Sequence, residues 1–199
     1  MTTQSRGEET RTRILDAALA GFARYGYDST SVAQICKRAN VTKGGFYHHF
    51  PSKQAIFLEL LERWLESVDM QLEGMRSGTG AVPEQLLRMT ATIRQVFQDA
   101  DGKLPIFLEF LTKAGHSPVV WQATVAPFRK YHQFFAQMIE EGIAEGSLRA
   151  VDPDFATRVL LSIAIGLLVQ GLLDPHSANW GQVAQEGVKL LLEGLEGTT

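Results

Sequence analysis

The stretch Asn40–Lys53, NVTKGGFYHHFPSK, decides how the N-terminal part of this chain folds. Helical patterns flank it, yet two adjacent glycines stand at its centre, and each glycine costs about 1 kcal/mol relative to alanine inside a helix. A tyrosine and two histidines follow almost at once. A bare backbone next to polar side chains suits a metal ion, the phosphate of a small nucleotide, or DNA.

Metal binding and nucleotide binding fit this stretch poorly. His48 and His49 are neighbours in sequence, so on a helix they point about 100° apart and do not grip one ion. The letters KGG resemble part of a phosphate loop, but the preceding strand and the GxxxxGK[ST] spacing are missing. His116 and His132 stand alone, without a paired nucleophile. We therefore expect no metal, no cofactor and no enzymatic site.

DNA binding uses every feature of the stretch. An apolar stripe at helical spacing precedes it, in a helix that Thr30 or Ser31 can cap. A left-handed turn at Asn40 and a short helix capped by Thr42 complete a helix-turn-helix, whose second helix enters the major groove by its N-terminal end. Glycines at that end let the backbone approach DNA, and the polar side chains that follow offer hydrogen bonds to phosphates and base edges.

The charge distribution agrees with a DNA-binding head. Residues 1–53 carry eight Lys and Arg against four Asp and Glu, and the rest carries 11 against 18. A single cysteine permits no intrachain disulfide, and the N-terminus lacks the apolar core of a signal peptide, so we expect a cytoplasmic protein. The apolar run Val159–Leu173 is short for a bilayer span of about 20 residues, which favours a helix buried in protein over a membrane helix.

The whole chain reads as helix. No segment shows the period-2 alternation of a half-buried strand, and breaks at Gly, Pro and Asp residues separate about nine helical segments. The long segment from Pro118 contains Pro127, which predicts a kink or a restart there. We predict an all-α protein with a three-helix DNA-binding domain over residues 1–53 and a helical body over residues 54–199.

The N-terminal quarter resembles the TetR family of transcriptional regulators. The segments that carry this resemblance are ILDAALAGFARYGYDSTSV, ANVTKGGFYHHF and SKQAIF. The resemblance implies a homodimer that binds a palindromic double-stranded operator, with a ligand pocket and a dimer interface in the body. It implies DNA contacts at Thr30, Thr42, Lys43, Gly44, Tyr47, His49 and Lys53. To these we add Gly45, whose bare backbone lets DNA approach, and His48, which we expect to read bases together with Lys43. Asn40 and Gly45 depart from the usual family residues, which leaves the operator sequence open.

Aromatic residues are concentrated between Leu104 and Phe135, where seven of the chain's 18 occur. They form either a plain core or the wall of a pocket, since ligand sites are mostly apolar with a few polar anchors. We interpret Gln122 and His132 as such anchors. The candidate lining for a small apolar or amphipathic ligand is Trp64, Phe107, Phe110, Leu111, Trp121, Gln122, Phe128, Tyr131 and His132.

Residues 153–195 are predicted to form the dimer. Their first helix is apolar nearly all round, with Ser162 and Gly166 one turn apart to allow close approach of a partner helix. With the apolar stripe over 180–195, this pattern predicts a four-helix interface across a twofold axis. With the family resemblance, we expect a ligand-responsive homodimeric regulator, with a ligand-released repressor favoured over an activator or a regulator without a ligand. The alternative is a helical small-molecule-binding or enzymatic protein whose DNA-binding head is vestigial.

Overall fold

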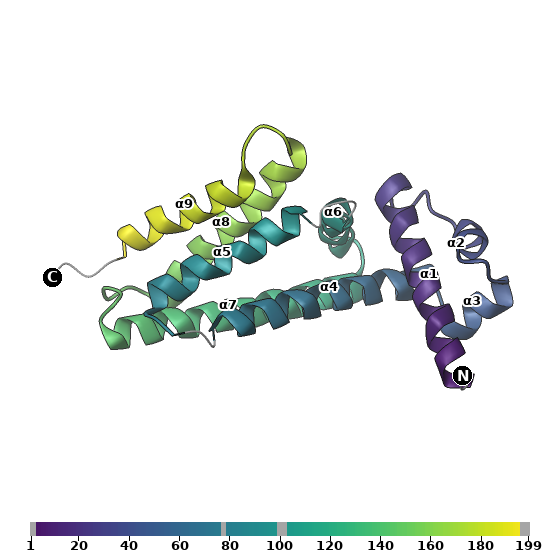
Figure 1. Ribbon diagram of the computed structural model, residues 1–199, viewed down its shortest axis with the longest axis horizontal. Coiled ribbons are helices and arrows are strands. Elements are labelled where there is room, and N and C mark those ends of the chain that lie inside the picture. The colour runs from purple at the N-terminus through teal and green to yellow at the C-terminus, as the bar shows by residue number, and fades with distance from the viewer. Residues whose placement is uncertain (1–2, 77–78, 99–102, 196–199) are drawn as a thin grey trace. The chain divides into compact units, whose positions relative to one another are not determined.

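The computed structural model describes residues 3–76, 79–98 and 103–195, and this part of the chain contains nine α-helices and no strand (Figure 1). The predicted all-α fold is confirmed. α7 runs through Pro127 as a single helix, so the chain does not restart there. The helices are α1 (Thr3–Tyr25), α2 (Val32–Ala39), α3 (Lys43–His49), α4 (Lys53–Arg76), α5 (Val82–Gln98), α6 (Lys103–Ala114), α7 (Pro118–Glu145), α8 (Pro153–Leu173) and α9 (Trp180–Glu193).

Local interactions set the ends of α2 and α3. Ser31 is the N-cap of α2: its side chain accepts from the Gln34 amide, and the Gln34 side chain accepts from the Ser31 amide. Asn40 ends α2 in the left-handed conformation, with φ of 53° and ψ of 52°. Thr42 then caps α3 by accepting from the Gly45 amide at 3.0 Å. The predicted left-handed turn and the Thr42 cap are both present.

The chain divides into two compact units, which we describe separately. Unit 1 comprises Met1–Glu66 and Asp101–Thr124, and unit 2 comprises Ser67–Ala100 and Val125–Thr199. This division differs from the predicted boundary after Lys53. The reason is that α1–α3 alone do not complete a core: the first half of α4, all of α6 and the start of α7 add apolar side chains to it.

The core of unit 1 holds α1, α2 and α3 against α4 and α6. Phe57 of α4 is fully buried, contacts Phe22 edge-on and stacks on Phe110 of α6 at a ring-centroid distance of 3.8 Å. Phe46 and Phe50 anchor α3 and its C-terminal end. The buried residues of this core are Ile14, Leu15, Ala17, Ala18, Phe22, Ile35, Cys36, Ala39, Phe46, Phe50, Ile56, Phe57, Leu61, Ile106, Phe110, Ala114 and Val120.

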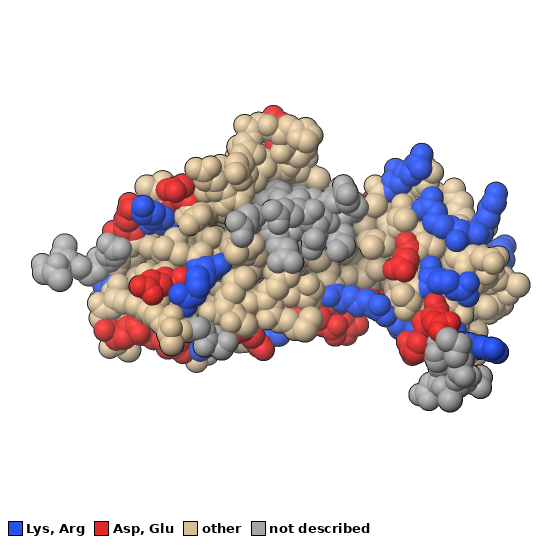
Figure 2. Space-filling model, in the orientation of Figure 1, with Lys and Arg blue, Asp and Glu red and all other residues tan. Residues whose placement is uncertain are grey.

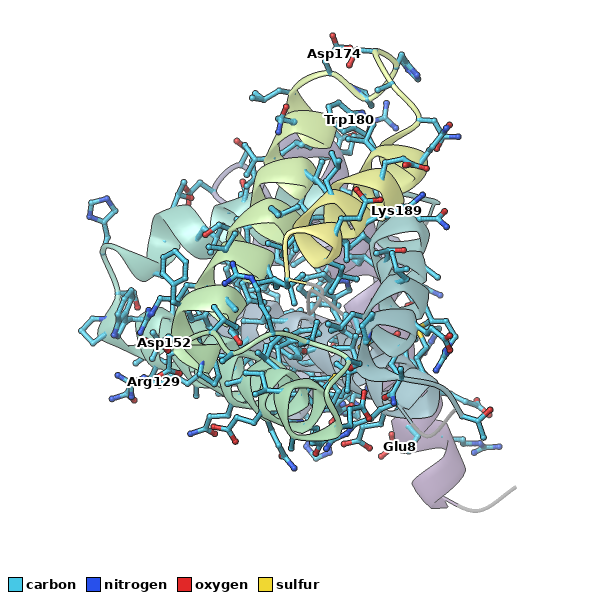
Figure 3. The ribbon with its side chains drawn as sticks, turned by 90° about the vertical axis from the view of Figure 1, so that its left-hand side faces the viewer. Glu8, Arg129, Asp152, Asp174, Trp180 and Lys189 are labelled. Carbon is cyan, nitrogen blue, oxygen red and sulfur yellow. The ribbon has the colours of Figure 1, made fainter. Side chains whose placement is uncertain are left out.

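Unit 2 is built around α9, which packs on α5 and α8 (Figure 1). The turn between α8 and α9 is closed by the Trp180 indole, which donates to the Asp174 carbonyl at 3.1 Å (Figure 3). The core residues come from every helix of the unit. They are Leu72, Val82, Leu86, Met89, Met138, Ile139, Leu148, Ala156, Leu160, Val188, Leu192 and Leu195.

One chain does not bury α8 on all sides. By length and composition alone α8 could cross a membrane, as can the core helix of many water-soluble proteins, and only 28% of its most apolar window is buried. Phe155 at its start is 62% exposed and Leu173 at its end is 78% exposed. Among the described residues of one chain, α8 is therefore not buried on all sides, and the expectation of a helix buried all round in protein is not met by this chain alone.

Candidate nucleic-acid interface

The outer face of α3 is polar and accessible because its inner face is fixed by aromatic anchors. Phe46 is fully buried and Phe50 is 2% exposed, which orients the short helix on the core of unit 1. Lys43, Gly44 and His48 are exposed as a result, and Tyr47 is 54% exposed. Gly45 and His49 are partly exposed beside them.

No internal packing requires the two glycines at the start of α3. A Cβ added at Gly44 would come no closer than 3.8 Å to another group, the Thr42 hydroxyl. A Cβ at Gly45 would lie 3.4 Å from the same hydroxyl, an ordinary van der Waals contact. Both positions could therefore hold alanine, which forms helices better. The bare backbone faces outward, where an approaching partner gains access to it.

Basic side chains lie on α1 and α2, which precede α3 in the same unit, with acidic side chains among them (Figure 2). Figure 2 shows Lys and Arg residues gathered over α1 and α2, at the end of unit 1 that carries the helix-turn-helix. Among the side chains that the structure describes, no three His, Cys, Asp or Glu residues are grouped as a metal site would need. A short, exposed, N-terminally bare helix in the same unit as these cations suits a polyanion.

Comparison with known proteins agrees with this geometry. Residues 14–60 match the family described as bacterial regulatory proteins, tetR family, and residues 83–195 match the family described as BetI-type transcriptional repressor, C-terminal. The second match alone covers more than half of the 199 residues. This chain belongs to the TetR family.

Individual TetR-family proteins resemble most of the chain. The HTH-type transcriptional regulator UidR of Escherichia coli K12 is 30% identical over 173 residues, 83% of each chain. The structure of Salmonella enterica GusR, 26% identical, superposes with a TM-score of 0.73 over 92% of this chain and 95% of that one. A transcriptional regulator from Saccharomonospora viridis in complex with choline, 22% identical, gives 0.83 over 96% and 100%. The protein is thus a DNA-binding transcriptional regulator and not an enzyme.

Thr30, one of the residues assigned from the family pattern, has its side chain inside the protein. It is 1% exposed, and its hydroxyl donates to the Gly26 carbonyl at 2.8 Å. Its methyl group packs so closely on α1 that a Cβ at Gly21 would lie 2.8 Å away. The Thr30 side chain is therefore a packing element rather than a phosphate contact. The exposed N-cap Ser31 replaces it as the candidate, and the S-x-x-Q spacing of a capping box was the signal for it.

Lys53 of this TetR-family protein is engaged by its own chain. Its Nζ donates to the carbonyls of Tyr27 at 2.7 Å and Thr30 at 2.9 Å, and it lies 3.5 Å from the Asp28 carbonyl oxygen. Burial lowers the pKa of this ammonium, although the charges of Asp28 and Glu109 oppose the shift. Lys53 thus uses its ammonium donors to hold the α1–α2 loop, and its role as a phosphate contact stays a prediction.

The predicted ligand residues are divided between the two units. Phe110 is 3% exposed and packs in the core of unit 1, and its place in a ligand pocket stays a prediction. The side chain of Phe107 lies outside the described part of the structure. The other residues of unit 1 in this set are Trp64, Leu111, Trp121 and Gln122, and those of unit 2 are Phe128, Tyr131 and His132. Leu111, Trp121, Gln122 and Phe128 are exposed.

Unit 2 contains buried polar atoms without partners among the described residues. His132 places Nδ1 3.6 Å from the Asp154 carboxylate of α8, while its Nε2 is buried and unpartnered. Thr157, one turn after Asp154, is fully buried with an unpartnered hydroxyl, and the Gln71 side-chain oxygen is likewise unsatisfied. The sequence analysis missed Thr157 and Gln71. Thr157 offered a weak signal, as a polar residue near the start of a very apolar helix.

Tyr131 should make the stability of unit 2 sensitive to alkali. Burial first, and then the hydrogen bond and charge of Asp69, raise the pKa of its hydroxyl above the ordinary value of 10.0. Because the folded protein keeps a proton that the unfolded chain loses, this stabilisation is complete below the unfolded-state pKa of 10.0 and declines as pH rises above it. Urea unfolding from about pH 8 to about pH 11 measures the decline.

The Tyr131→Phe variant, which cannot ionise at this position, should lose stability less steeply over the same alkaline range. Tyr25→Phe is the control, because Tyr25 is 49% exposed. Equal alkaline slopes for wild type and Tyr131→Phe would contradict the assignment.

Proposed function

We propose that this TetR-family protein is a cytoplasmic homodimeric repressor that binds a palindromic operator through α3 and is released by an apolar or amphipathic small molecule. The observation that carries the proposal is the outward face of α3, where Gly44 and Gly45 have room for side chains that they lack. Contact with DNA explains why both positions lack a side chain, because the sugar-phosphate backbone must come close to the N-terminus of the helix.

The roles on α3 follow from exposure and chemistry. Lys43 supplies positive charge at the first position of the helix, and Tyr47 and His49 reach the flanking phosphates. His48 is exposed beside them and is the base-reading candidate with Lys43, because an imidazole both donates and accepts hydrogen bonds. A homodimer presents this set twice, about 34–36 Å apart, to successive major grooves of a palindrome.

Unpartnered apolar surface supports the dimer. Leu173 on α8 is 78% exposed and Leu190 on α9 is 69% exposed. Gly166, midway along α8, has no neighbouring atom within 4 Å of the point where a Cβ would lie, so nothing in its own chain requires a glycine there. Close packing of α8 from a second copy of the chain explains the glycine, because small residues let two helices approach each other closely.

Buried polar atoms in unit 2 support an amphipathic ligand. An unsatisfied buried donor or acceptor costs about 1–3 kcal/mol, and His132 Nε2 and the Thr157 hydroxyl are two such atoms. A small molecule with one hydrogen-bonding group and an apolar body would satisfy them. Ligand binding controls DNA affinity only if the ligand prefers one arrangement of the protein over the other.

The test of DNA binding begins with capture and sequencing of genomic fragments on the purified protein. Lys43→Ala should weaken binding to all sequences and reduce the slope of log affinity against log salt by about one for each phosphate that the variant no longer neutralises. His48→Ala should instead change the preference between captured sites. Fluorescence anisotropy over a range of salt concentrations measures both effects.

Lys189→Ala is the control for loss of one lysine charge, because Lys189 is an exposed residue of α9 in unit 2 (Figure 3). It should leave the salt slope unchanged. A wild-type protein that captures no fragment above background would overturn the proposal and support a vestigial DNA-binding head. An unchanged slope in Lys43→Ala would remove Lys43 from the phosphate contacts.

A further inference from the structure

The loop between α1 and α2 is held through its backbone by a carboxylate of α6. The amide of Tyr27 donates to both carboxylate oxygens of Glu109, at 2.9 and 2.8 Å. The preceding residue, Gly26, has φ of +80°, and a Cβ there would lie 3.0 Å from the same carboxylate. The loop therefore passes close to the Glu109 carboxylate and is fixed to it by a charge-assisted hydrogen bond.

A second residue of α6 holds the same loop through a side chain. Lys113, one turn after Glu109, lies 2.8 and 2.9 Å from the two carboxylate oxygens of Asp28. Its ammonium also lies 4.8 Å from the centroid of the Tyr27 ring, and that of Lys53 lies 4.2 Å from it. Two cations next to one aromatic ring fix the ring as well as the backbone of this residue.

The packing of α6 on the core anchors these contacts. Its inner face places Ile106, Phe110 and Ala114 in the core of unit 1, and Phe110 stacks on Phe57. The α1–α2 loop, which Glu109 and Lys113 contact, leads directly into Ser31 and the first turn of α2. The position of the loop thus determines where α2 begins, and α2 packs on both α1 and α3.

The geometry points to Glu109 and Lys113 as positioning residues for operator binding: they clamp the α1–α2 loop and so hold α2 and α3 in the orientation that DNA requires. This inference rests on the proposed function, since it concerns the DNA affinity of the helix-turn-helix. Neither residue lies on α2 or α3. The two residues act through Tyr27 and Asp28, which places control of the DNA-binding surface partly on α6.

The direction in which DNA affinity changes distinguishes this positioning role from a general electrostatic effect. Glu109→Gln and Asp28→Asn each remove one negative charge from unit 1, so Coulomb attraction alone would tighten DNA binding. Loss of the clamp should do the opposite. We expect about tenfold weaker binding to the operator for Glu109→Gln and about two- to fivefold weaker binding for Asp28→Asn, whose ion pair is more exposed. Affinity for non-specific DNA should stay within about twofold of wild type, because non-specific binding depends on charge rather than on exact orientation.

The matched control is Glu62→Gln, which makes the same charge change at an exposed position of α4 in unit 1. It should bind the operator as wild type does or slightly more tightly. Thermal unfolding of each variant checks that unit 1 remains folded. The amide resonance of Tyr27 in a nitrogen–proton correlation spectrum reports the clamp itself and should move upfield in Glu109→Gln but not in Glu62→Gln.

The outcomes distinguish this inference from the function on which it rests. Wild-type protein that binds no captured fragment overturns the proposed function. Wild-type binding that Glu109→Gln and Asp28→Asn match or exceed overturns the clamp alone. Should Glu109→Gln fail to fold, Asp28→Asn decides the question, because its side chain is 82% exposed and takes no part in the core.

Discussion

Gly166→Arg should convert the protein into a folded monomer that no longer binds its operator. The structure makes this substitution selective, since a side chain at Gly166 meets nothing within 4 Å in its own chain. An arginine is therefore tolerated by the monomer but introduces an unpaired charge into the proposed helix–helix interface. That should cost several kcal/mol of dimer stability, with about 3–5 kcal/mol typical of an uncompensated buried charge. A monomer carries only one helix-turn-helix, which can bind only one half of a palindromic operator.

Light scattering and sedimentation measure the oligomeric state, and anisotropy measures operator affinity on the same samples. Gly74→Arg provides the control, because a Cβ on that exposed glycine of α4 likewise meets nothing within 4 Å. It should remain dimeric and bind DNA normally. If Gly166→Arg stays soluble and dimeric, the interface lies on another surface.

Phe110→Ala should unfold or loosen unit 1 and abolish operator binding with or without a ligand. The side chain is 3% exposed and stacks on the fully buried Phe57 at 3.8 Å. Removal of a buried phenyl ring typically costs about 3–5 kcal/mol, a large part of the stability of a small domain. If Phe110 instead lined a ligand pocket, as in the candidate lining from the sequence, its truncation would reduce ligand affinity and leave DNA binding intact.

Urea unfolding and operator anisotropy decide between these expectations. Leu111→Ala is the neighbouring control, since Leu111 is 39% exposed and its truncation should change stability by less than about 1 kcal/mol. A Phe110→Ala protein with wild-type stability and DNA affinity would place the ring outside the essential core and favour the pocket interpretation.

The helix-turn-helix could be predicted from the sequence because short-range interactions specify it. The caps at Ser31 and Thr42, and the left-handed Asn40 between them, involve residues within a few positions of one another. The alternation of buried Phe46 with exposed Tyr47 and His48 likewise follows from helix periodicity. The family resemblance rests on the same segment, and the comparisons confirm it.

The structure adds most at residues whose surroundings come from distant parts of the chain. The Lys53 side chain turns to a loop 23–26 residues earlier in sequence, and Phe110 meets Phe57 across 53 positions. The family resemblance marked Lys53 as functional, and the concentration of aromatic residues between Leu104 and Phe135 marked Phe110. Only the tertiary structure assigns the first to loop carbonyls and the second to the core.

Unit 1 is discontinuous in sequence, and this limits how the protein can be cut and recombined. A fragment ending at residue 60 contains the segment that matches the family's N-terminal region, yet it lacks Ile106, Phe110, Ala114 and Val120 of the same core. Such a fragment would expose the apolar surface that α6 covers. A chimaera that swaps sensor bodies between relatives must therefore transfer residues 101–124 together with the head, or redesign that surface, as for any domain with an inserted neighbour.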